Sequence, residues 1–265
     1  MPIVTISRGS YSHGKEVAER VAERLGYECV AREVLLEASQ QFNVPEVQLR
    51  EAIEIAPSAF DPLAHKKRKF VAYIQAALLR KVRRDNVVYH GFAGHFFLRR
   101  VPNVVKVRIL ADLEHRIHIV MARDGVTWGE AAKLIETLDE QRRQWSLSLY
   151  GMDPADPSLY DLVLNIKQLT VEGAVELVCK AAALPEFQTT PEATEVLEDL
   201  SLEAEVRIAL GELGIDFRVH AEQGKVRVEA RAPHDKRELV KKEIRESLEK
   251  IVGIKEMEVE VLPGR

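Results

Sequence analysis

The segment from Ile3 to Leu25 constrains the fold more than any other part of this 265-residue chain. An apolar run, Ile3 to Ile6, leads into a loop with glycines at positions 9 and 14 and a lysine at position 15. Apolar residues then recur at helical spacing as far as Leu25. A strand, a Gly-x-x-x-x-Gly-Lys loop and a helix in this order are typical of a phosphate-binding loop. An ordinary glycine turn between a strand and a helix is the alternative interpretation.

The loop supplies the residues that we expect around a phosphate. Lys15 provides a mobile positive charge for the terminal phosphates of a nucleotide. It is followed by Glu16, where the usual Ser or Thr would place a hydroxyl on Mg²⁺. A histidine within the loop either hydrogen-bonds phosphate or faces solvent. The predicted phosphate-binding residues are Gly9, Ser10, Ser12, His13, Gly14, Lys15 and Glu16.

Composition is that of a globular protein. The chain is 46% hydrophobic and 30% charged, so it can bury a sizeable core without a disulfide or metal. Its net charge of −4 argues against a surface that coats nucleic acid. Cys29 and Cys179 lie far apart in apolar settings, which predicts two buried thiols in a reducing compartment. No apolar run could span a bilayer and no secretory signal is visible, so we expect a cytoplasmic protein.

Strands and helices alternate as far as residue 184. Short apolar runs at 27–30, 86–89, 104–110 and 161–166 indicate buried strands. Helical patterns lie at 16–25, 32–42, 44–55, 65–84, 113–122, 127–145 and 170–183, with a break at 57–62. The alternation predicts an α/β fold with a parallel sheet covered by helices on both faces. The turns after Ile6, Tyr89 and Leu110 are expected to share one crevice, beyond the carboxyl ends of the strands.

The pattern changes after Leu184. Residues 185–199 are polar and are predicted to form a linker. A helix at 202–213, a hairpin of strands 216–221 and 225–232, a helix at 235–252 and a strand at 257–262 follow. This order, αββαβ, predicts a small α+β domain. We therefore expect a first domain at 1–184, a linker at 185–199 and a second domain at 200–265.

Two other features have competing interpretations. The basic run at 65–69 is either a solvated helix face, as most charge runs are, or a positive wall facing phosphates. A nucleic-acid or phospholipid surface is a third use for it, with binding that falls steeply as salt rises. His90 and His95 flank a glycine turn, but they lack Cys or acidic partners at the spacing of a zinc site. We therefore predict no metal site built by the protein alone.

Several segments of the first domain resemble the cytidylate kinase-like family, relatives of the P-loop nucleoside monophosphate kinases. They are Ile3 to Ala18, Ala31 to Glu33, Pro102 to Arg108, Leu138 to Arg143 and Asp156 to Asn165. The resemblance implies a P-loop NTPase-type sheet. It also implies transfer of the γ-phosphoryl group of ATP, with Mg²⁺, to a nucleoside monophosphate such as CMP or dCMP.

The resemblance implies roles for single residues as well. Arginines of the lid region clamp phosphate in the family, and an acidic residue on the same helix would orient an arginine. The residues implied at the reacting phosphates are Lys15, Asp139, Arg142 and Arg143. Those implied at the substrate are Arg32, Arg123 and Asp161.

Three positions depart from the family pattern. Glu16 follows the loop lysine, Ala31 stands in place of an Asp, and Phe92 stands in place of an Arg after Gly91. Each change removes a polar group from the expected crevice. A second function therefore stays open, that of a nucleotide-binding regulator without turnover that signals through the C-terminal domain.

The C-terminal domain resembles a BON-type module. The resemblance rests on the hairpin at Gly224 and on the turn Val252-Gly253-Ile254 before the last strand. Such modules are associated with membranes or with protein contacts. No anchor accompanies this one, so we expect a protein partner or a homo-oligomer contact.

Overall fold

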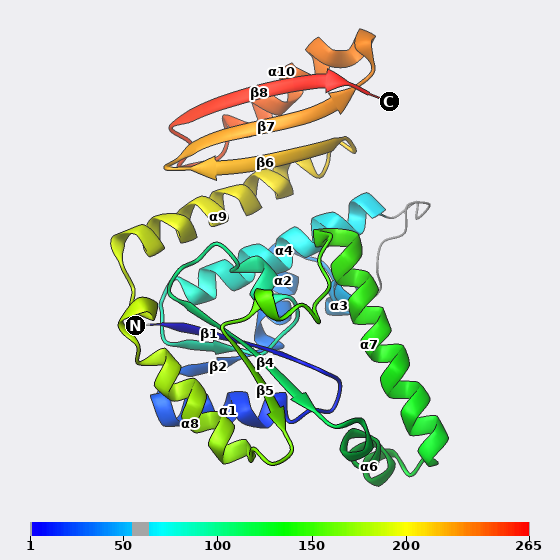
Figure 1. Cartoon of the computed structure of the whole chain (residues 1–265). Helices are drawn as coiled ribbons and strands as arrows, with labels where there is room; N and C mark the ends of the chain where they lie inside the picture. Colours follow the sequence, from blue (N-terminus) through cyan, green and yellow to red (C-terminus); the bar gives the residue numbers. More distant parts are fainter. Residues whose placement is uncertain (1, 55–63, 265) are drawn as a thin grey trace.

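A computed structural model describes residues 2–54 and 64–264 of the chain. Its first unit is built on a five-stranded sheet in the order β2-β3-β1-β4-β5 (Figure 1). The strands are β1 (Ile3–Arg8), β2 (Glu28–Val30), β3 (Val87–Tyr89), β4 (Val104–Ala111) and β5 (Leu162–Ile166). All pairings in this sheet are parallel, with Thr5 of β1 opposite Tyr89 of β3 and Lys106 of β4. The predicted parallel sheet is therefore confirmed.

Helices cover both faces of this sheet. One face packs on α1 (Gly14–Leu25) and α8 (Val171–Ala182). The other packs on α2 (Glu33–Phe42), α3 (Glu46–Glu54) and α4 (Ala64–Val82). Neighbouring residues of β1 serve different layers, with Ile3 in one core and Val4 in the other, which explains the nearly continuous apolar run. The break expected at 57–62 lies outside the described residues.

A helical hairpin stands beside the carboxyl edge of the sheet (Figure 1). It consists of α6 (Leu113–Asp124) and α7 (Trp128–Tyr150), while a short α5 (Gly94–Phe97) follows β3. Thr127 and Glu130 form the predicted capping box at the start of α7. The helix continues past the expected end at 145 because Trp145 is buried, and its Nε1 donates to the carbonyl of Ala52 at 2.9 Å.

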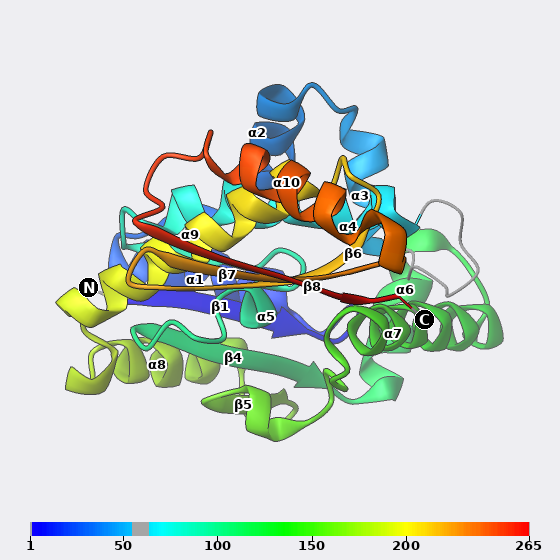
Figure 2. The same ribbon diagram turned by 90° about the horizontal axis from the view of Figure 1, so that it is seen from above.

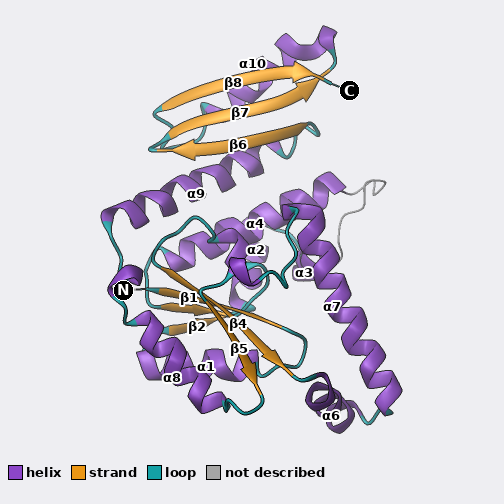
Figure 3. Cartoon of the chain, viewed as in Figure 1, coloured by secondary structure: helices purple, strands orange, loops and turns teal. Residues whose placement is uncertain are grey.

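The C-terminal unit has the predicted αββαβ order (Figures 2 and 3). It comprises α9 (Pro191–Leu210), β6 (Asp216–Glu222), β7 (Lys225–Ala232), α10 (Arg237–Leu248) and β8 (Glu256–Pro263). The strands β6 and β7 form an antiparallel hairpin, and β8 pairs parallel to β7. A separate apolar core lies between this sheet and the helices α9 and α10.

The region expected to be a linker differs most from the prediction. The helix α9 begins at Pro191, with Thr190 as its N-cap, whereas the sequence pattern placed its start at 202. A threonine cap followed by proline is a helix start signal. Leu197 and Leu200 of this segment join the core of the first unit, so the polar residues form one face of a packed helix.

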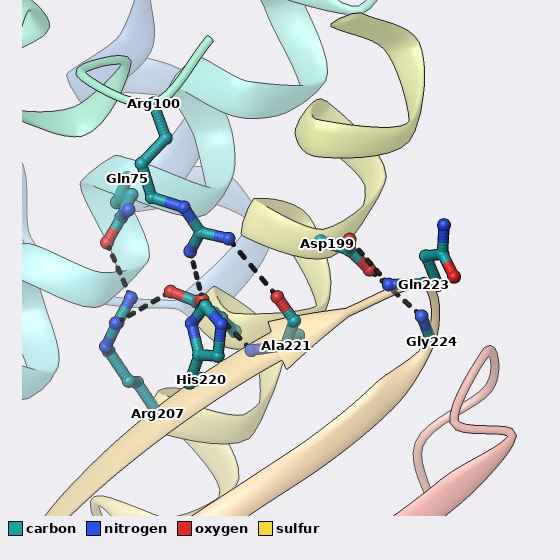
Figure 4. Close-up of polar contacts among 9 residues, drawn as sticks. Gln75, Arg100, Asp199, Arg207, His220, Ala221, Gln223 and Gly224 are labelled. Carbon is teal, nitrogen blue, oxygen red and sulfur yellow. Dashed lines mark hydrogen bonds and ion pairs between the residues drawn. The ribbon is translucent and has the colours of Figure 1, made fainter. Parts of the chain in front are cut away.

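A buried carboxylate joins the two units. The Glu203 side chain of α9 is 4% exposed. Its Oε1 accepts from the Ala221 N–H at 3.0 Å and from the guanidinium of Arg100, and lies 3.2 Å from His220 Nδ1. Its Oε2 accepts from Arg207 Nη2 at 2.9 Å. Figure 4 shows the partners Arg100, Arg207, His220 and Ala221 close together. Elements of both units therefore converge on one anion.

The basic run at 65–69 also faces the C-terminal unit. Arg68 Nη1 lies 3.1 Å from Asp216 Oδ1, and Lys69 forms an ion pair with Glu212. Neither side chain lines the cleft described below. The interpretation of this run as a phosphate-facing wall is therefore wrong for these two residues.

Two further expectations concern the chain as a whole. Cys29 and Cys179 are free thiols that are partly buried rather than fully buried. Across 2–54 and 64–264, no helix has both the length and the apolar character needed to cross a bilayer.

Candidate functional site

A cleft of about 1430 Å³ opens beside the carboxyl ends of the strands in the first unit. Its lining includes Ser7 to Gly9 at the end of β1, His90 to Ala93 after β3, and Leu110 of β4. Helix α7 provides much of the remaining wall. The prediction that the turns after these three strands meet in one crevice is therefore confirmed.

The loop between β1 and α1 has a fixed, unusual backbone. Tyr11 and His13 adopt left-handed conformations, with φ of 60° and 62°, which non-glycine residues seldom do. The Ser12 hydroxyl is bonded to the carbonyls of Gly9 and Ile109, both at 2.9 Å, which ties the loop to β4. The first amides of α1 have no carbonyl one turn earlier, and the helix dipole favours an anion beside them. This end of α1 is therefore suited to bind phosphate.

The second glycine of the loop makes room for an arginine. A Cβ atom on Gly14 would lie 2.6 Å from Arg8 Cβ and 2.8 Å from Arg8 Cδ. Arg8 ends β1, and its Nη1 donates to His90 Nδ1 at 3.3 Å. The glycine is thus required by the path of the Arg8 side chain across the loop.

Alongside the carboxylates of Glu54, Glu136, Asp139, Glu140 and Asp153, the polar lining of the cleft contains five arginines. They are Arg8, Arg108, Arg116, Arg142 and Arg143. Arg143 pairs with Asp153 at 2.7 Å, and Arg108 donates to the Tyr160 hydroxyl at 3.1 Å. Arg142, in contrast, donates to the Arg8 carbonyl at 3.4 Å. The cleft therefore contains both paired and unpaired guanidinium groups.

Asp139 of α7 connects the helical hairpin to the loop. Its Oδ1 accepts from the Ser10 N–H at 3.0 Å, and its Oδ2 accepts from Arg116 Nη2 at 2.5 Å. Arg116 Nε also donates to the Ser10 carbonyl at 2.6 Å. Burial alone would raise the pKa of Asp139, but the bonds from Arg116 and Ser10 outweigh it and lower this pKa. Asp139 is therefore an ionised group that orients an arginine, and that arginine belongs to α6.

Lys15 and Glu16 lie beside the loop rather than in the cleft lining. The Lys15 side chain is 67% exposed, and its Nζ is 3.5 Å from Glu19. The Glu16 carboxylate is 2.9 Å from Arg20 and 3.1 Å from His13 Nδ1. The negative charge of Glu16 is therefore already engaged by neighbours on its own helix and in the loop.

The three residues expected at the substrate do not line the cleft. Arg32 makes two bonds to Glu46 at 2.8 and 2.9 Å on the surface. Asp161 accepts from the Lys106 N–H at 2.7 Å, which joins β4 to the start of β5. Arg123 contacts the loop between β1 and α1, donating from Nη2 to the Tyr11 hydroxyl at 3.0 Å.

Sequence reasoning assigned no role to Arg8 and Arg116 of this cleft, and it considered His90 and His95 only as zinc ligands. Burial, and then the charge of Arg8, lowers the pKa of His90 to about 4. Burial, and then Arg108, lowers the pKa of His95 to about 3. Both imidazoles are therefore neutral at neutral pH. The sequence signal for two of these residues was their position: Arg8 ends β1, and His90 directly follows the neighbouring strand β3.

The donor groups of the cleft fit nucleotide phosphates better than a bare metal ion. Within the described ranges, no group of three or more His, Cys, Asp or Glu is placed to hold a metal. The buried Ser10 hydroxyl, 3% exposed as a residue, also has no hydrogen-bond partner in the described part of the chain. ATP phosphates suit the loop amides and arginines, and Mg²⁺ would be held mainly by phosphate and water oxygens.

Comparison with known proteins finds a family model, curated proteins and a solved structure that are similar to this chain. A model of the cytidylate kinase-like family matches residues 3–168. A cytidylate kinase of Ignicoccus hospitalis is 30% identical over 181 residues, covering 67% of this chain and 97% of that protein. A cytidylate kinase of Archaeoglobus fulgidus is 27% identical over 189 residues, covering 70% and 97%. A solved structure of an uncharacterized protein from Eubacterium ventriosum has a TM-score of 0.55 at 22% identity, over 68% of this chain and 97% of its own.

Proposed function

Because the chain belongs to the cytidylate kinase-like family, we propose that it transfers the γ-phosphoryl group of ATP to a nucleoside monophosphate, with CMP or dCMP as acceptor. The observation that carries the proposal is the arginine-lined cleft between the loop at the start of α1 and the helix α7. Phosphoryl transfer needs positioning and charge stabilisation more than covalent help from the protein. A cleft with this lining can supply both.

ATP supplies the electrophilic phosphorus, and its Mg²⁺ offsets phosphate charge. The loop amides from Tyr11 to Lys15 would bind the donor phosphates, since those of Gly9 and Ser10 already donate to the Ile109 carbonyl and to Asp139. Lys15 would act as a mobile point charge that its exposed position leaves free to move. Arg116 and Arg142 would act on the charge that develops during transfer. Asp139 would hold Arg116 in place through its ion pair.

The second candidate is a nucleotide-binding regulator without turnover. Phe92 stands at a position where the family pattern has an arginine, and its ring packs edge-on against Trp145 at 5.0 Å. The Glu203 junction also offers a physical connection from the first unit to the C-terminal unit. These two observations favour a protein in which nucleotide binding acts on the C-terminal unit.

For the C-terminal unit, we propose that residues 200–265 form a BON-like module that binds a protein partner or a second copy of the chain. Residues 1–184 would form the catalytic domain. Sedimentation velocity on the full chain tests the homo-oligomer, because a monomer at all concentrations would remove it.

Turnover separates the two candidate functions. ADP production is measured from ATP and Mg²⁺ across a panel of nucleoside monophosphates, for the full chain and for Lys15→Ala. We expect turnover with CMP or dCMP, and a loss of about 100-fold or more in the variant, the scale of removing one charge-stabilising donor. The matched control is Lys242→Ala, an exposed lysine of the C-terminal unit that pairs with Glu246.

The other outcomes are equally informative. Absence of turnover, with ATP binding that is lost in Lys15→Ala, would support the regulator instead of the kinase. Absence of both turnover and nucleotide binding would contradict both functions.

A further inference from the structure

We propose that Arg8 and Arg142 together bind a phosphoryl group in the cleft, and that His90 is a positioning residue that holds Arg8 without neutralising it. The inference rests on the proposed function, because it states which side chains of that cleft hold a phosphate monoester. The ligand is the phosphate of the acceptor nucleotide or the terminal phosphate of the donor, which share this chemistry.

The first support is the fixed path of Arg8. Its aliphatic stem passes over Gly14, where even a methyl group would clash. Its guanidinium then meets His90 Nδ1 at 3.3 Å. Arg142 of α7 donates to the Arg8 backbone carbonyl at 3.4 Å, and its charge acts on the Arg8 guanidinium. Two positive side chains from different elements therefore converge at the end of β1.

The second support is the lack of a direct ion-pair partner, since Asp139, the carboxylate that acts most on Arg142, is bonded to Arg116 instead. Among residues 2–54 and 64–264, no carboxylate lies within ion-pair distance of either guanidinium, although Arg116 and Arg143 of the same cleft have Asp139 and Asp153. Burial, and then the charge of Arg142, lowers the pKa of Arg8. Placing like charges together and partly away from water is unfavourable. A phosphate dianion would remove that penalty and accept several charge-assisted hydrogen bonds.

The third support is the chemistry of the group that holds Arg8. His90 is 8% exposed and neutral, so it accepts a hydrogen bond through Nδ1 but contributes no negative charge. A carboxylate at that position would form an ion pair with Arg8 and compete with a phosphate. A neutral acceptor orients the guanidinium and leaves its full charge for a ligand.

The test is calorimetric titration of the full chain with CMP, cytidine, ATP and inorganic phosphate. For Arg8→Gln and Arg142→Gln we expect CMP affinity to fall about 10- to 100-fold, the range of one lost charge-assisted bond, while cytidine affinity stays the same. If the site holds the donor phosphate, ATP affinity falls instead and CMP affinity is unchanged. The matched control is Arg227→Gln on β7, whose partner is Glu258.

Two substitutions of His90 separate positioning from a general structural role. His90→Asn keeps an acceptor near the Nδ1 position, and we expect phosphate-ligand affinity within about threefold of the wild-type value. His90→Glu adds a carboxylate beside Arg8, and we expect it to bind as weakly as Arg8→Gln. Thermal unfolding of each variant checks that the fold is retained. Equal losses in the Asn and Glu variants would contradict the positioning role.

The outcomes also separate this site from the proposed kinase function. If wild-type protein binds CMP and ATP but Arg8→Gln and Arg142→Gln bind them equally well, the two-arginine site is wrong while the kinase proposal stands. If wild-type protein binds neither nucleotide, the kinase proposal fails, and phosphate binding that is weaker in Arg8→Gln still supports the site. Wild-type protein that binds no phosphate ligand at all would overturn both.

Discussion

The cleft and the junction between the two units treat buried charge in opposite ways. At the junction, the Glu203 carboxylate accepts hydrogen bonds from Arg100, Arg207 and the Ala221 N–H (Figure 4). In the cleft, Arg8 and Arg142 are both partly buried. Within residues 2–54 and 64–264, the one side chain that Arg8 hydrogen-bonds is the neutral imidazole of His90. The buried charge of Glu203 is therefore paired with cations of the protein, whereas those of Arg8 and Arg142 have no ion-pair partner among the described residues.

This difference indicates that buried charges serve a structural role at the junction and a binding role in the cleft. A buried ion whose partners are all supplied by the protein contributes to one fixed arrangement of elements, and removing it leaves those partners unpaired. A cluster of like charges costs stability and persists in proteins where a ligand completes it. The same residue types therefore hold the two units together in one place and prepare a binding site in the other.

The sharpest test of the cleft is Arg142→Gln. We expect turnover with CMP to fall by about 100- to 1,000-fold, because an unpaired guanidinium is free to stabilise the charge of the transferred group. The free energy of unfolding should stay the same or rise by about 0.5 kcal/mol, since repulsion from Arg8 is relieved. Steady-state kinetics and urea unfolding measure the two effects.

The variant Arg143→Gln, at the adjacent position, is the comparison for Arg142→Gln. Its guanidinium is already paired with Asp153 at 2.7 Å and lies 3.6 Å from Glu140. We expect a smaller loss of turnover, about tenfold or less. Equal losses in the two variants would break the distinction between paired and unpaired arginines.

The corresponding test of the junction is Glu203→Gln. Loss of the charge leaves Arg100 and Arg207 without their anion, so we expect the free energy of unfolding to fall by about 3 kcal/mol, with nucleotide affinity nearly unchanged. Urea unfolding followed by circular dichroism measures it, and Glu260→Gln on the exposed side of β8 is the control. A change below about 1 kcal/mol would place Glu203 among ordinary surface charges.

Local signals explain how much of the fold was predictable. The strand, loop and helix from Ile3 to Leu25 and the hairpin at Gly224 depend on residues close together in sequence, and all formed as predicted. The predicted start of α9 was wrong. The polar composition of this segment drew attention away from the cap at Thr190 and from the apolar spacing of Leu197 and Leu200. Those leucines are buried only once α4 lies against them.

The site was less predictable, since its contacts span long sequence separations. Asp139, Arg142 and Arg143 do line the cleft. They could be predicted because a family pattern identifies the helix that faces the loop. The same reasoning assigned Arg32 and Asp161 to the substrate, whereas in the structure they lie outside the cleft lining and bond to Glu46 and the Lys106 N–H. No pattern along the chain indicates such partner choices, or the contact of Arg8 with His90.

The last prediction concerns the pH dependence of stability, and it follows from the neutral state of His90. Its pKa lies at about 4 in the folded chain and near 6.5 when unfolded, because of burial and then Arg8. Lys15 also opposes protonation, whereas Glu19 and Glu33 favour it. The unfolded state therefore takes up a proton first, so stability is fully present above about pH 6.5 and falls as the pH drops toward 4. Between pH 7 and pH 5 we expect this histidine to account for a loss of about 1–2 kcal/mol.

Urea unfolding at the two pH values, for wild-type protein and His90→Asn, measures that contribution. The variant keeps the acceptor for Arg8 but cannot titrate, so it should lose less stability than wild-type protein on acidification. His95, with its pKa at about 3, contributes in the same direction in both proteins and cancels in the comparison. Equal losses would mean that His90 becomes protonated in the folded cleft. Arg8 would then lack its neutral acceptor, and the contrast with the junction would have to rest on Arg142 alone.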